Sequence, residues 1–219
     1  MISVIIPTMW TPPTTKILLY RLCQEKLITQ IIVIDNDKNN NPNYDILNHQ
    51  KIQVETQTKN IFVNPAWNIG AQKCKNDIIC IMNDDVILFD NPFEFVIKNM
   101  KYNTGVIGLN LQKDQPYLSI EPLENMKSVL AFGCVMFMKI QNYFPIPDSL
   151  RVFYGDNYLF DKNKLQGNIN YVVNGVRNNK VFGLTSDTLY KLIGVHAHDM
   201  IKYENLIYNN IIQYQSLFL

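Results

Sequence analysis

Apolar residues gather in short runs along the first 90 positions, and each run ends in polar residues. The runs 3–7, 30–37 and 77–82 are nearly continuous in hydrophobicity, without the alternation of a strand that has one solvated face. Continuous β-branched runs of this length are typical of strands buried on both faces of a parallel sheet. A weaker run at 51–56 is a fourth candidate strand.

Two segments between these runs have apolar residues at helical spacing. The first, 14–27, follows a proline pair and a threonine cap and carries Leu18, Leu19, Leu22, Cys23 and Leu27. The second, 65–75, places proline in its first turn. Strands that alternate with helices in this way predict an α/β fold with a mostly parallel central sheet covered by helices.

The second half of the chain has a more mixed pattern. Gly133 interrupts an apolar run and indicates a bend or a close backbone approach. No repeat, low-complexity linker or break in composition divides the chain, so we expect a single domain over 1–219. The expected elements are a helix at 91–102, strands at 104–112 and 128–143, a short helix within 150–167, strands at 170–175 and 181–185, and a helix at 187–212.

Composition supports a folded domain and argues against nucleic acid as a partner. The chain has 219 residues, of which 47% are hydrophobic and 18% charged, below the roughly 25% charged residues of an average domain. Its net charge is +1, and no basic run supplies the positive surface that nucleic acids require.

The cysteines and the termini bear on the compartment. Four cysteines without a C-x-x-C pair favour a reducing compartment and no structural zinc. The chain has neither the features of a signal peptide nor an apolar run long enough for a transmembrane segment. We therefore expect a cytoplasmic protein. The heavy use of Asn, Ile and Lys suits an AT-rich genome, such as that of a large DNA virus. For a viral protein, the expected location is the cytoplasm of the host.

Polar residues follow three of the predicted strands, and these carry the candidate chemistry. They are Pro7-Thr8, Asp35 and the triplet Asn83-Asp84-Asp85. In an open parallel sheet, ligands bind beyond the carboxyl ends of the strands, so these groups should share one crevice. Adjacent carboxylates repel each other unless they are neutralised, solvated or metal-bound. Oxygen ligands favour Mg²⁺ or Mn²⁺, completed by substrate phosphates; a plain surface turn is the alternative.

The order of five motifs resembles that of the family-2 nucleotide-sugar glycosyltransferases. The motifs are "SVIIPT", "IIVIDN", "NPAWNIGAQKCKNDIICIMNDDVIL", "FGCVMFMK" and "FYGDNYLF", and the resemblance covers about 1–165. It implies a GT-A, Rossmann-like fold and one catalytic domain over 1–219. Its nucleotide-binding half would be 1–100 and its acceptor-side half 101–219. Each motif alone is weak, and their order carries the specificity.

The resemblance implies a donor site built by the first half. Asp35 would accept a hydrogen bond from uracil N3–H, although a turn or cap residue is the alternative. Asp85 would be the metal ligand. Trp67 stands where the family usually has arginine, so no charged contact is expected there. The remaining residues implied to bind the donor nucleotide are Pro7, Thr8, Asn68, Asn83 and Asp84.

The resemblance also implies a catalytic base, Asp156, which follows Gly155 where the family has glutamate. Asp156 would take the proton of the acceptor hydroxyl as that oxygen attacks the anomeric carbon, with inversion. A helix N-cap is the alternative role. The family often supplies a late histidine to the metal; here either His196 or His198 would replace it, or the metal would have only Asp85 and phosphates. We expect them on a helix, where two residues two positions apart diverge by about 200°.

We therefore expect a metal-dependent, inverting glycosyltransferase that moves a hexose from a nucleotide-diphosphate sugar to a hydroxyl of a glycan or another acceptor. A UDP-sugar such as UDP-glucose is the expected donor, and Mn²⁺ or Mg²⁺ the cofactor. One rival is a nucleotide-sugar or glycan-binding module without turnover. The other is a sugar nucleotidyltransferase, but the segment after the first strand lacks the glycine-rich phosphate loop of that class.

Overall fold

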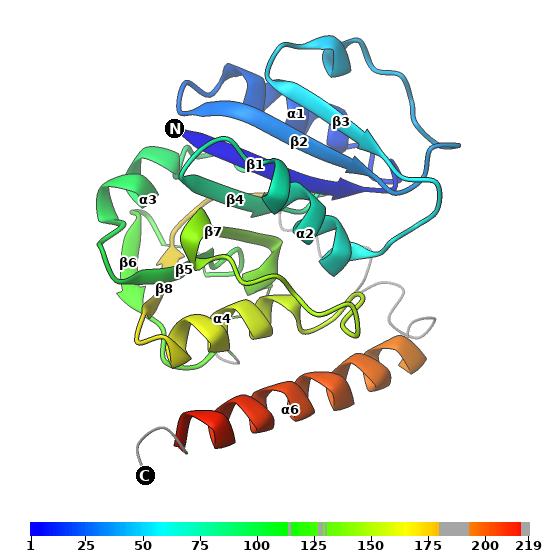
Figure 1. The fold of residues 1–219 in the computed structure, drawn as a ribbon. Coiled ribbons are helices and arrows are strands. Elements are labelled where there is room, and N and C mark those ends of the chain that lie inside the picture. Colours follow the sequence, from blue (N-terminus) through cyan, green and yellow to red (C-terminus); the bar gives the residue numbers. More distant parts are fainter. Residues whose placement is uncertain (114, 127–128, 130, 180–192, 216–219) are drawn as a thin grey trace.

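A computed structural model describes residues 1–113, 115–126, 129, 131–179 and 193–215, with side chains of the last helix described as far as 209. The chain is built around one sheet with the strand order β3-β2-β1-β4-β7-β5-β8-β6 (Figure 1). The first four strands in this order run parallel to one another. They are β1 (Ile2–Thr8), β2 (Ile28–Asp35), β3 (Ile52–Thr56) and β4 (Ile78–Met82).

The other half of the sheet has mixed directions. Strand β7 (Val135–Lys139) runs antiparallel to both of its neighbours, β4 and β5 (Thr104–Leu109). Strand β8 (Ile169–Asn174) is parallel to β5, and the edge strand β6 (Ser119–Pro122) is antiparallel to β8. The central sheet is therefore mostly parallel where the predicted donor residues lie and mixed beyond β4.

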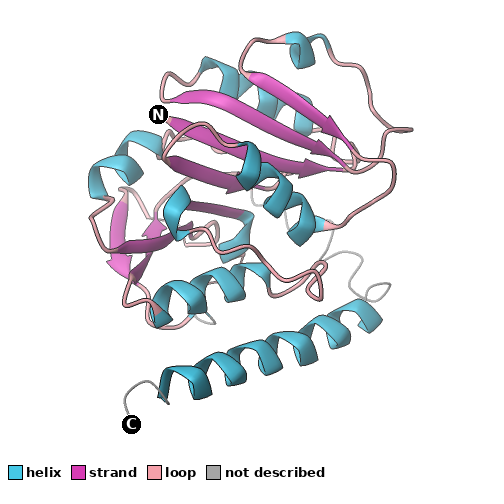
Figure 2. Ribbon diagram, viewed as in Figure 1, coloured by secondary structure: helices cyan, strands magenta, loops and turns pink. Residues whose placement is uncertain are grey.

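Helices cover both faces of the sheet (Figure 2). Helices α1 (Thr15–Gln24) and α3 (Phe93–Asn99) pack on one face, and α2 (Val63–Lys73) and α4 (Gly155–Leu165) on the other. Helix α6 (Ile193–Gln215) lies alongside α4 on the outside of the molecule (Figure 1). Short 3-10 turns are η1 (Asp45–Asn48), η3 (Phe132–Cys134) and η4 (Ile140–Asn142).

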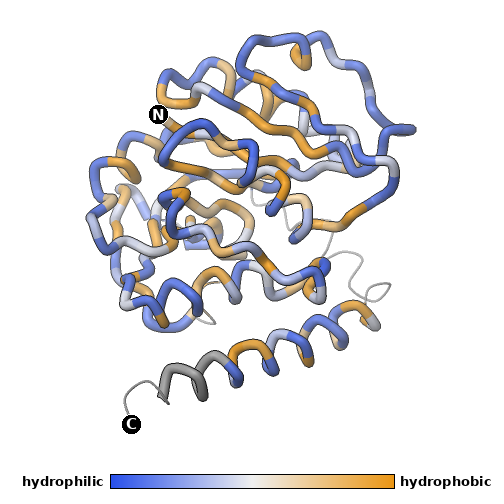
Figure 3. The backbone as a smooth tube through the Cα atoms, in the orientation of Figure 1, coloured by the Kyte–Doolittle hydropathy of each residue, from blue (hydrophilic) through white to orange (hydrophobic). Residues whose placement is uncertain are grey.

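Burial on both faces explains the unbroken apolar runs. In β1, Val4 and Ile6 belong to the core beneath α1, while Ile5 between them packs beneath α2, and all three are fully buried. A strand with a core on each side needs apolar residues at every position, so its hydrophobicity does not alternate. Figure 3 shows these strands as hydrophobic segments joined by hydrophilic loops.

The predicted α/β architecture is confirmed, and two details differ. The expected strand 128–143 is too long, because residues 132–134 and 140–142 form 3-10 turns at either end of β7. The edge strand β6 was not predicted, since its four residues include a proline and a glutamate and gain order only by pairing with β8. The expected strand 181–185, and residues 187–192 of the last expected helix, lie outside the described residues.

Among the described helices, none combines the length and hydropathy needed to cross a membrane. The four cysteines are all free thiols.

The helix α2 approaches β1 closely at Gly70. A Cβ placed on Gly70 would lie 2.3 Å from Cγ2 of Ile5, far inside van der Waals contact. Because Ile5 is a branched, fully buried side chain, it cannot rotate away without opening the core. The glycine of the N-x-G motif is therefore required by helix–sheet packing.

We expect Gly70→Ala to lower the free energy of unfolding by about 1–3 kcal/mol, the cost of overpacking a core. Gly194→Ala is the matched control, because Gly194 lies in α6 and its added methyl group meets nothing within 4 Å. Denaturant unfolding should show the control unchanged or slightly more stable. Equal stability of the two variants would contradict the close approach.

Candidate functional site

The ends of β1, β2 and β4 meet at one edge of the sheet, as expected. Thr8, the last residue of β1, pairs in register with Asp35 at the end of β2. On its other side, Thr8 Oγ1 donates a 2.6 Å hydrogen bond to Oδ2 of Asp84, two residues beyond β4. Pro7 lies one position inside the strand, opposite Ile34, and is buried. Asp84 and Asp85, which follow β4 here, are called the acidic edge below.

Asp35 is fully buried, and the contacts of its carboxylate lie within the protein. Oδ1 accepts hydrogen bonds from Trp10 Nε1 at 2.8 Å and from the backbone N–H of Asp37 at 3.0 Å. Oδ2 accepts from Asn41 Nδ2 at 3.1 Å and from Thr56 Oγ1 at 3.3 Å. Asp35 therefore ties together the loops that follow β1 and β2 and the last residue of β3.

The acidic edge concentrates negative charge in a poorly solvated place. The removal of water raises the pKa of Asp84 to about 7; the hydrogen bond from Thr8 opposes this shift and the charge of Asp85 adds to it. Asp85 is 4% exposed, and its backbone carbonyl accepts a 2.9 Å hydrogen bond from Asn179. Burial, with the nearby charges of Asp85 and Asp156, also raises the pKa of Cys134 to about 12.

The donor atoms at the acidic edge suit a hard cation. Carboxylate and hydroxyl oxygens are the preferred ligands of Mg²⁺ and Mn²⁺, and the raised pKa of Asp84 shows that a positive charge would be favourable there. Within the part of the chain that the structure describes, no group of three or more His, Cys, Asp or Glu side chains could hold a metal. A metal at Asp84 and Asp85 would thus need further ligands, such as substrate phosphate oxygens or water.

A cleft of about 330 Å³ opens between α2, η3, the first turn of α4 and the first turn of α6. Asn83 reaches it from the end of β4, next to the acidic edge, and Asp156 reaches it from α4. The lining combines polar groups with several aromatic rings. It consists of Val63, Trp67, Asn83, Ala131, Gly133, Cys134, Val152, Phe153, Tyr154, Asp156, Asn157 and His196, and is called the Asp156 cleft below.

The carboxylate of Asp156 lies against the backbone of Gly133. A Cβ on Gly133 would lie 2.5 Å from Oδ2 of Asp156, so only glycine fits there. This is the close approach that the sequence indicated at Gly133. Burial raises the pKa of Asp156, and the backbone N–H groups of Asn157 and Gly133 oppose that shift. A carboxyl with a raised pKa is better matched to proton transfer near neutral pH.

Gly155 stands where the family pattern has glutamate, and its surroundings leave no room for a larger side chain. A Cβ on Gly155 would lie 2.1 Å from Oδ1 of Asn64 and 3.0 Å from Cζ3 of Trp67. Both side chains come from α2 and are buried, so they fill the volume that a glutamate would need. Trp67 and Gly155, which both depart from the family pattern, thus lie against each other.

Three predicted site residues lie elsewhere or are engaged by protein groups. The side chain of Asn68 contacts the 143–146 segment and not the donor residues. Its Nδ2 donates to the carbonyl of Ile146, and its Oδ1 accepts from the N–H of Ile146 and, at 2.7 Å, from Tyr143 Oη. His196 lines the Asp156 cleft with Nε2 3.3 Å from Tyr154 Oη. His198 is exposed and pairs with Asp199 at 3.0 Å. Both histidines are on a helix, as expected, and their rings take different directions.

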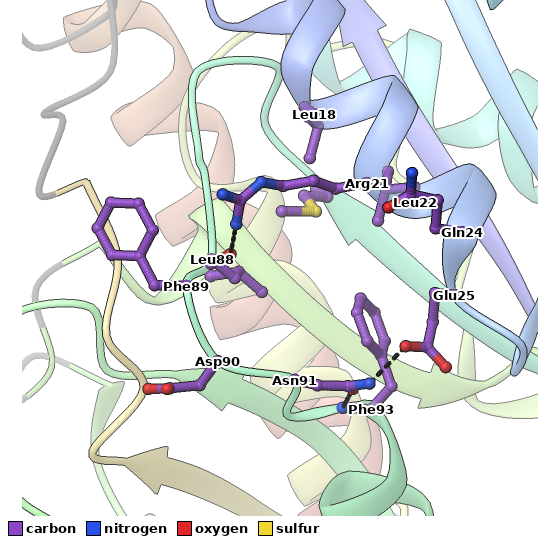
Figure 4. Close-up of a pocket in the computed structure, with 11 residues that line it drawn as sticks. Leu18, Arg21, Leu22, Gln24, Glu25, Leu88, Phe89, Asp90, Asn91 and Phe93 are labelled. Atoms are coloured by element: carbon purple, nitrogen blue, oxygen red, sulfur yellow. Dashed lines mark hydrogen bonds between the residues drawn. The ribbon is translucent and has the colours of Figure 1, made fainter.

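A second hollow, of about 400 Å³, lies on the opposite face of the sheet between α1 and residues 88–93 (Figure 4). It contains none of the predicted site residues. Two pairs of its polar groups bind each other: Arg21 donates to the carbonyl of Leu88 at 2.8 Å, and Asn91 donates to Glu25. Its chemistry does not match that of the acidic edge.

Sequence reasoning missed several residues that shape the site. Trp10 was not assigned to the site, yet its indole N–H donates to Asp35. Asn64 was not singled out, although it fixes the backbone carbonyl of Phe153 at 3.1 Å. Asp199 was missed as well, because a single aspartate in a helical pattern carries no signal of a long-range contact.

Comparisons with known proteins place this geometry in a family. Residues 3–174 match the model of "Glycosyl transferase family 2". Among curated proteins, no significant match was found. The structure of S. aureus TarS shares 15% sequence identity, with a TM-score of 0.63, over 81% of this chain and 36% of that one.

Two ligand-bound structures share the fold at similarly low sequence identity. S. aureus TarS 1-349 in complex with UDP-GlcNAc has 13% identity and a TM-score of 0.60, over 90% of this chain and 66% of that one. GalNAc-T7 with UDP, GalNAc and Mn²⁺ has 14% identity and a TM-score of 0.60, over 84% of this chain and 43% of that one.

The chain spans only part of the length of these proteins, for instance 57% of TarS 1-349 solved without a ligand named. At such low identity, the structural likeness establishes the fold, which is that of these GT-A glycosyltransferases. The family model covers most of the chain. The protein therefore belongs to glycosyltransferase family 2.

Proposed function

We propose that this chain transfers a hexose from a UDP-sugar to a hydroxyl acceptor, with inversion and with a divalent metal. The observation that carries the proposal is the placement of one carboxylate with a raised pKa, Asp156, in a cleft that begins at the acidic edge. A base on one side and a site for a bound diphosphate on the other are what a single-displacement transfer requires.

The donor side is the edge formed by β1, β2 and β4. Thr8 and Asp84 are joined there by a hydrogen bond, and Asn83 leads from this edge into the Asp156 cleft. In the solved structures that share the fold, TarS binds UDP and UDP-GlcNAc, and GalNAc-T7 binds UDP. A contact from Asp35 to the base would require one of its present partners, such as Trp10, to give way.

Asp84 and Asp85 would hold Mn²⁺ or Mg²⁺ together with the donor diphosphate. GalNAc-T7, which shares the fold, was solved with Mn²⁺. When bound, the metal supplies positive charge that offsets the charge of the departing diphosphate. Asn68 is left out of the proposed donor site, because its side chain already holds the 143–146 segment. We assign His196 to the acceptor side, because it lines the Asp156 cleft.

Asp156 serves as the general base. Its carboxylate is held against Gly133 and lines the cleft, where it can take a proton from an acceptor hydroxyl. Trp67, Phe153 and Tyr154 lend the cleft apolar ring surfaces. Such surfaces exclude water from the reacting groups, which strengthens electrostatic interactions there. The attacking oxygen then approaches the anomeric carbon from the side opposite the diphosphate.

The proposed function predicts UDP release from at least one UDP-sugar in the presence of Mn²⁺, and none in EDTA. The measurement is a donor screen with UDP-glucose, UDP-N-acetylglucosamine and UDP-N-acetylgalactosamine, with water and simple sugars as acceptors. Asp85→Asn should abolish the response to metal. Asp90→Asn, further along the same segment and paired with Arg177, should keep it. Release that continues unchanged in EDTA would contradict the proposed metal.

Asp156→Asn should reduce kcat by about 10²–10⁴-fold, the usual contribution of a general base. UDP affinity, measured by titration calorimetry, should stay unchanged because Asp156 is not in the donor site. Asp148→Asn is the control, since that carboxylate is exposed and does not line the cleft. Normal turnover by the Asp156 variant would remove it from the mechanism; normal UDP binding without turnover in the unmodified chain would favour the binding-module rival.

The raised pKa of Asp84 predicts a pH-dependent loss of stability in the metal-free protein. A carboxyl with a pKa of about 7 when folded and about 3.9 when unfolded binds more protons in the folded state between those values. Its stabilising contribution is complete below about pH 4 and is lost as the pH rises through 7. The free energies of unfolding of Asp84→Asn and of the unmodified chain should be measured in EDTA from pH 4 to 8. The variant should become more stable relative to the unmodified chain as the pH rises. A constant difference would contradict this assignment.

A further inference from the structure

Helix α6 lies beyond the residues matched by the family model, yet it reaches the Asp156 cleft. His196 lines the cleft itself, and Asp199, which is fully buried, ties α6 to the segment that borders it. A single oxygen, Oδ2, accepts hydrogen bonds from three consecutive backbone N–H groups. These belong to Arg151 at 3.0 Å, Val152 at 2.9 Å and Phe153 at 3.0 Å.

Three donors that converge on one carboxylate oxygen fix the backbone that carries them. Hydrogen bonds to an ionised group are about twice as strong as neutral ones, and an extended segment cannot point three successive N–H groups at one atom. The other oxygen of Asp199 pairs with His198 Nδ1 at 3.0 Å. Asp199 therefore imposes the conformation of residues 151–153.

That segment leads directly into the helix that carries the proposed base. Tyr154, the next residue, has φ +61°, a left-handed conformation that is unusual for a bulky side chain. It is the N-cap of α4, and Asp156 lies in the first turn. On the α2 side, Asn64 Nδ2 donates to the carbonyl of Phe153 at 3.1 Å. The segment is thus held between α2 and α6.

We infer that Asp199 is a positioning residue for Asp156, and that α6 is part of the catalytic unit. By ordering residues 151–153, Asp199 sets the turn at Tyr154 and so the direction from which Asp156 faces the acceptor. The kinetic part of this inference rests on the proposed function. The ordering of the segment does not depend on it.

A second anchor of α6 provides a matched control. Tyr203 Oη donates a hydrogen bond to Asp161 on α4, and its ring stacks on Tyr154 with centroids 5.1 Å apart. Tyr203→Phe keeps the stacked ring and removes only the hydrogen bond to Asp161. It weakens the attachment of α6 and leaves the hydrogen bonds of the 151–153 N–H groups in place. It therefore measures the effect of a loosened α6 on kcat separately from the loss of the Asp199 hydrogen bonds.

Asp199→Asn should lower kcat by about 100-fold, the scale expected when a reacting group is displaced by about 1 Å. The donor KM and the dissociation constant for UDP should stay within about twofold, because the donor edge is not touched. Tyr203→Phe should lose stability and keep its kcat. Asp199→Glu, which retains the charge, should lose less kcat than Asp199→Asn and provides the test if the asparagine variant does not fold.

Hydrogen exchange measured by mass spectrometry supplies a readout that does not need activity. Asp199→Asn should speed exchange of the amides of 151–157 at least tenfold and leave those of β1 unchanged, while Tyr203→Phe leaves 151–157 protected. Unchanged exchange and kcat in both Asp199 variants would overturn the inference, as would equal losses of kcat in Asp199→Asn and Tyr203→Phe. If the unmodified chain releases no UDP, the proposed function fails, and exchange alone decides the role of Asp199.

Discussion

The burial of two adjacent carboxylates at the end of β4 is the constraint on which the site depends. Asp84 and Asp85 follow a strand that is buried on both faces, so water cannot surround both of them. The pKa of Asp84 rises to about 7 as a result. A protein keeps such a group either by protonating it or by bringing positive charge to it, and in the proposed reaction a divalent metal would supply that charge. The hydrogen bond from Thr8 offsets only part of the penalty.

The rest of the architecture follows from where polar chemistry can be placed on such a sheet. Both faces are covered, by α1 and α3 on one side and by α2 and α4 on the other, so functional groups are confined to the carboxyl edge. At that edge the parallel strands supply the acidic groups, and the antiparallel insertion of β7 next to β4 brings η3 beside them. Gly133 then lets Asp156 lie against the η3 backbone. Two halves of the chain thereby meet in one cleft.

Sequence patterns predicted the parts of the molecule whose constraint is local. The continuous apolar runs identified β1, β2 and β4, since burial on both faces dictates every residue in them, and the glycine at 133 indicated its close contact correctly. The sequence could not predict that Asn64 and Trp67 fill the space beside Gly155, or that Asp199 caps residues 151–153, because these contacts join segments far apart in the chain. Strand β6 was missed for a related reason, as its order comes from pairing with β8 and not from its own propensity.

The most direct test of the central claim is the position of the metal. Crystals of the protein soaked with MnCl₂ and UDP, measured at a wavelength where manganese scatters anomalously, would show where the ion binds. The account predicts an anomalous peak within about 2.2 Å of a carboxylate oxygen of Asp85, with the UDP diphosphate completing its coordination. A manganese ion bound elsewhere, or UDP bound with the Asp85 carboxylate bare, would contradict it.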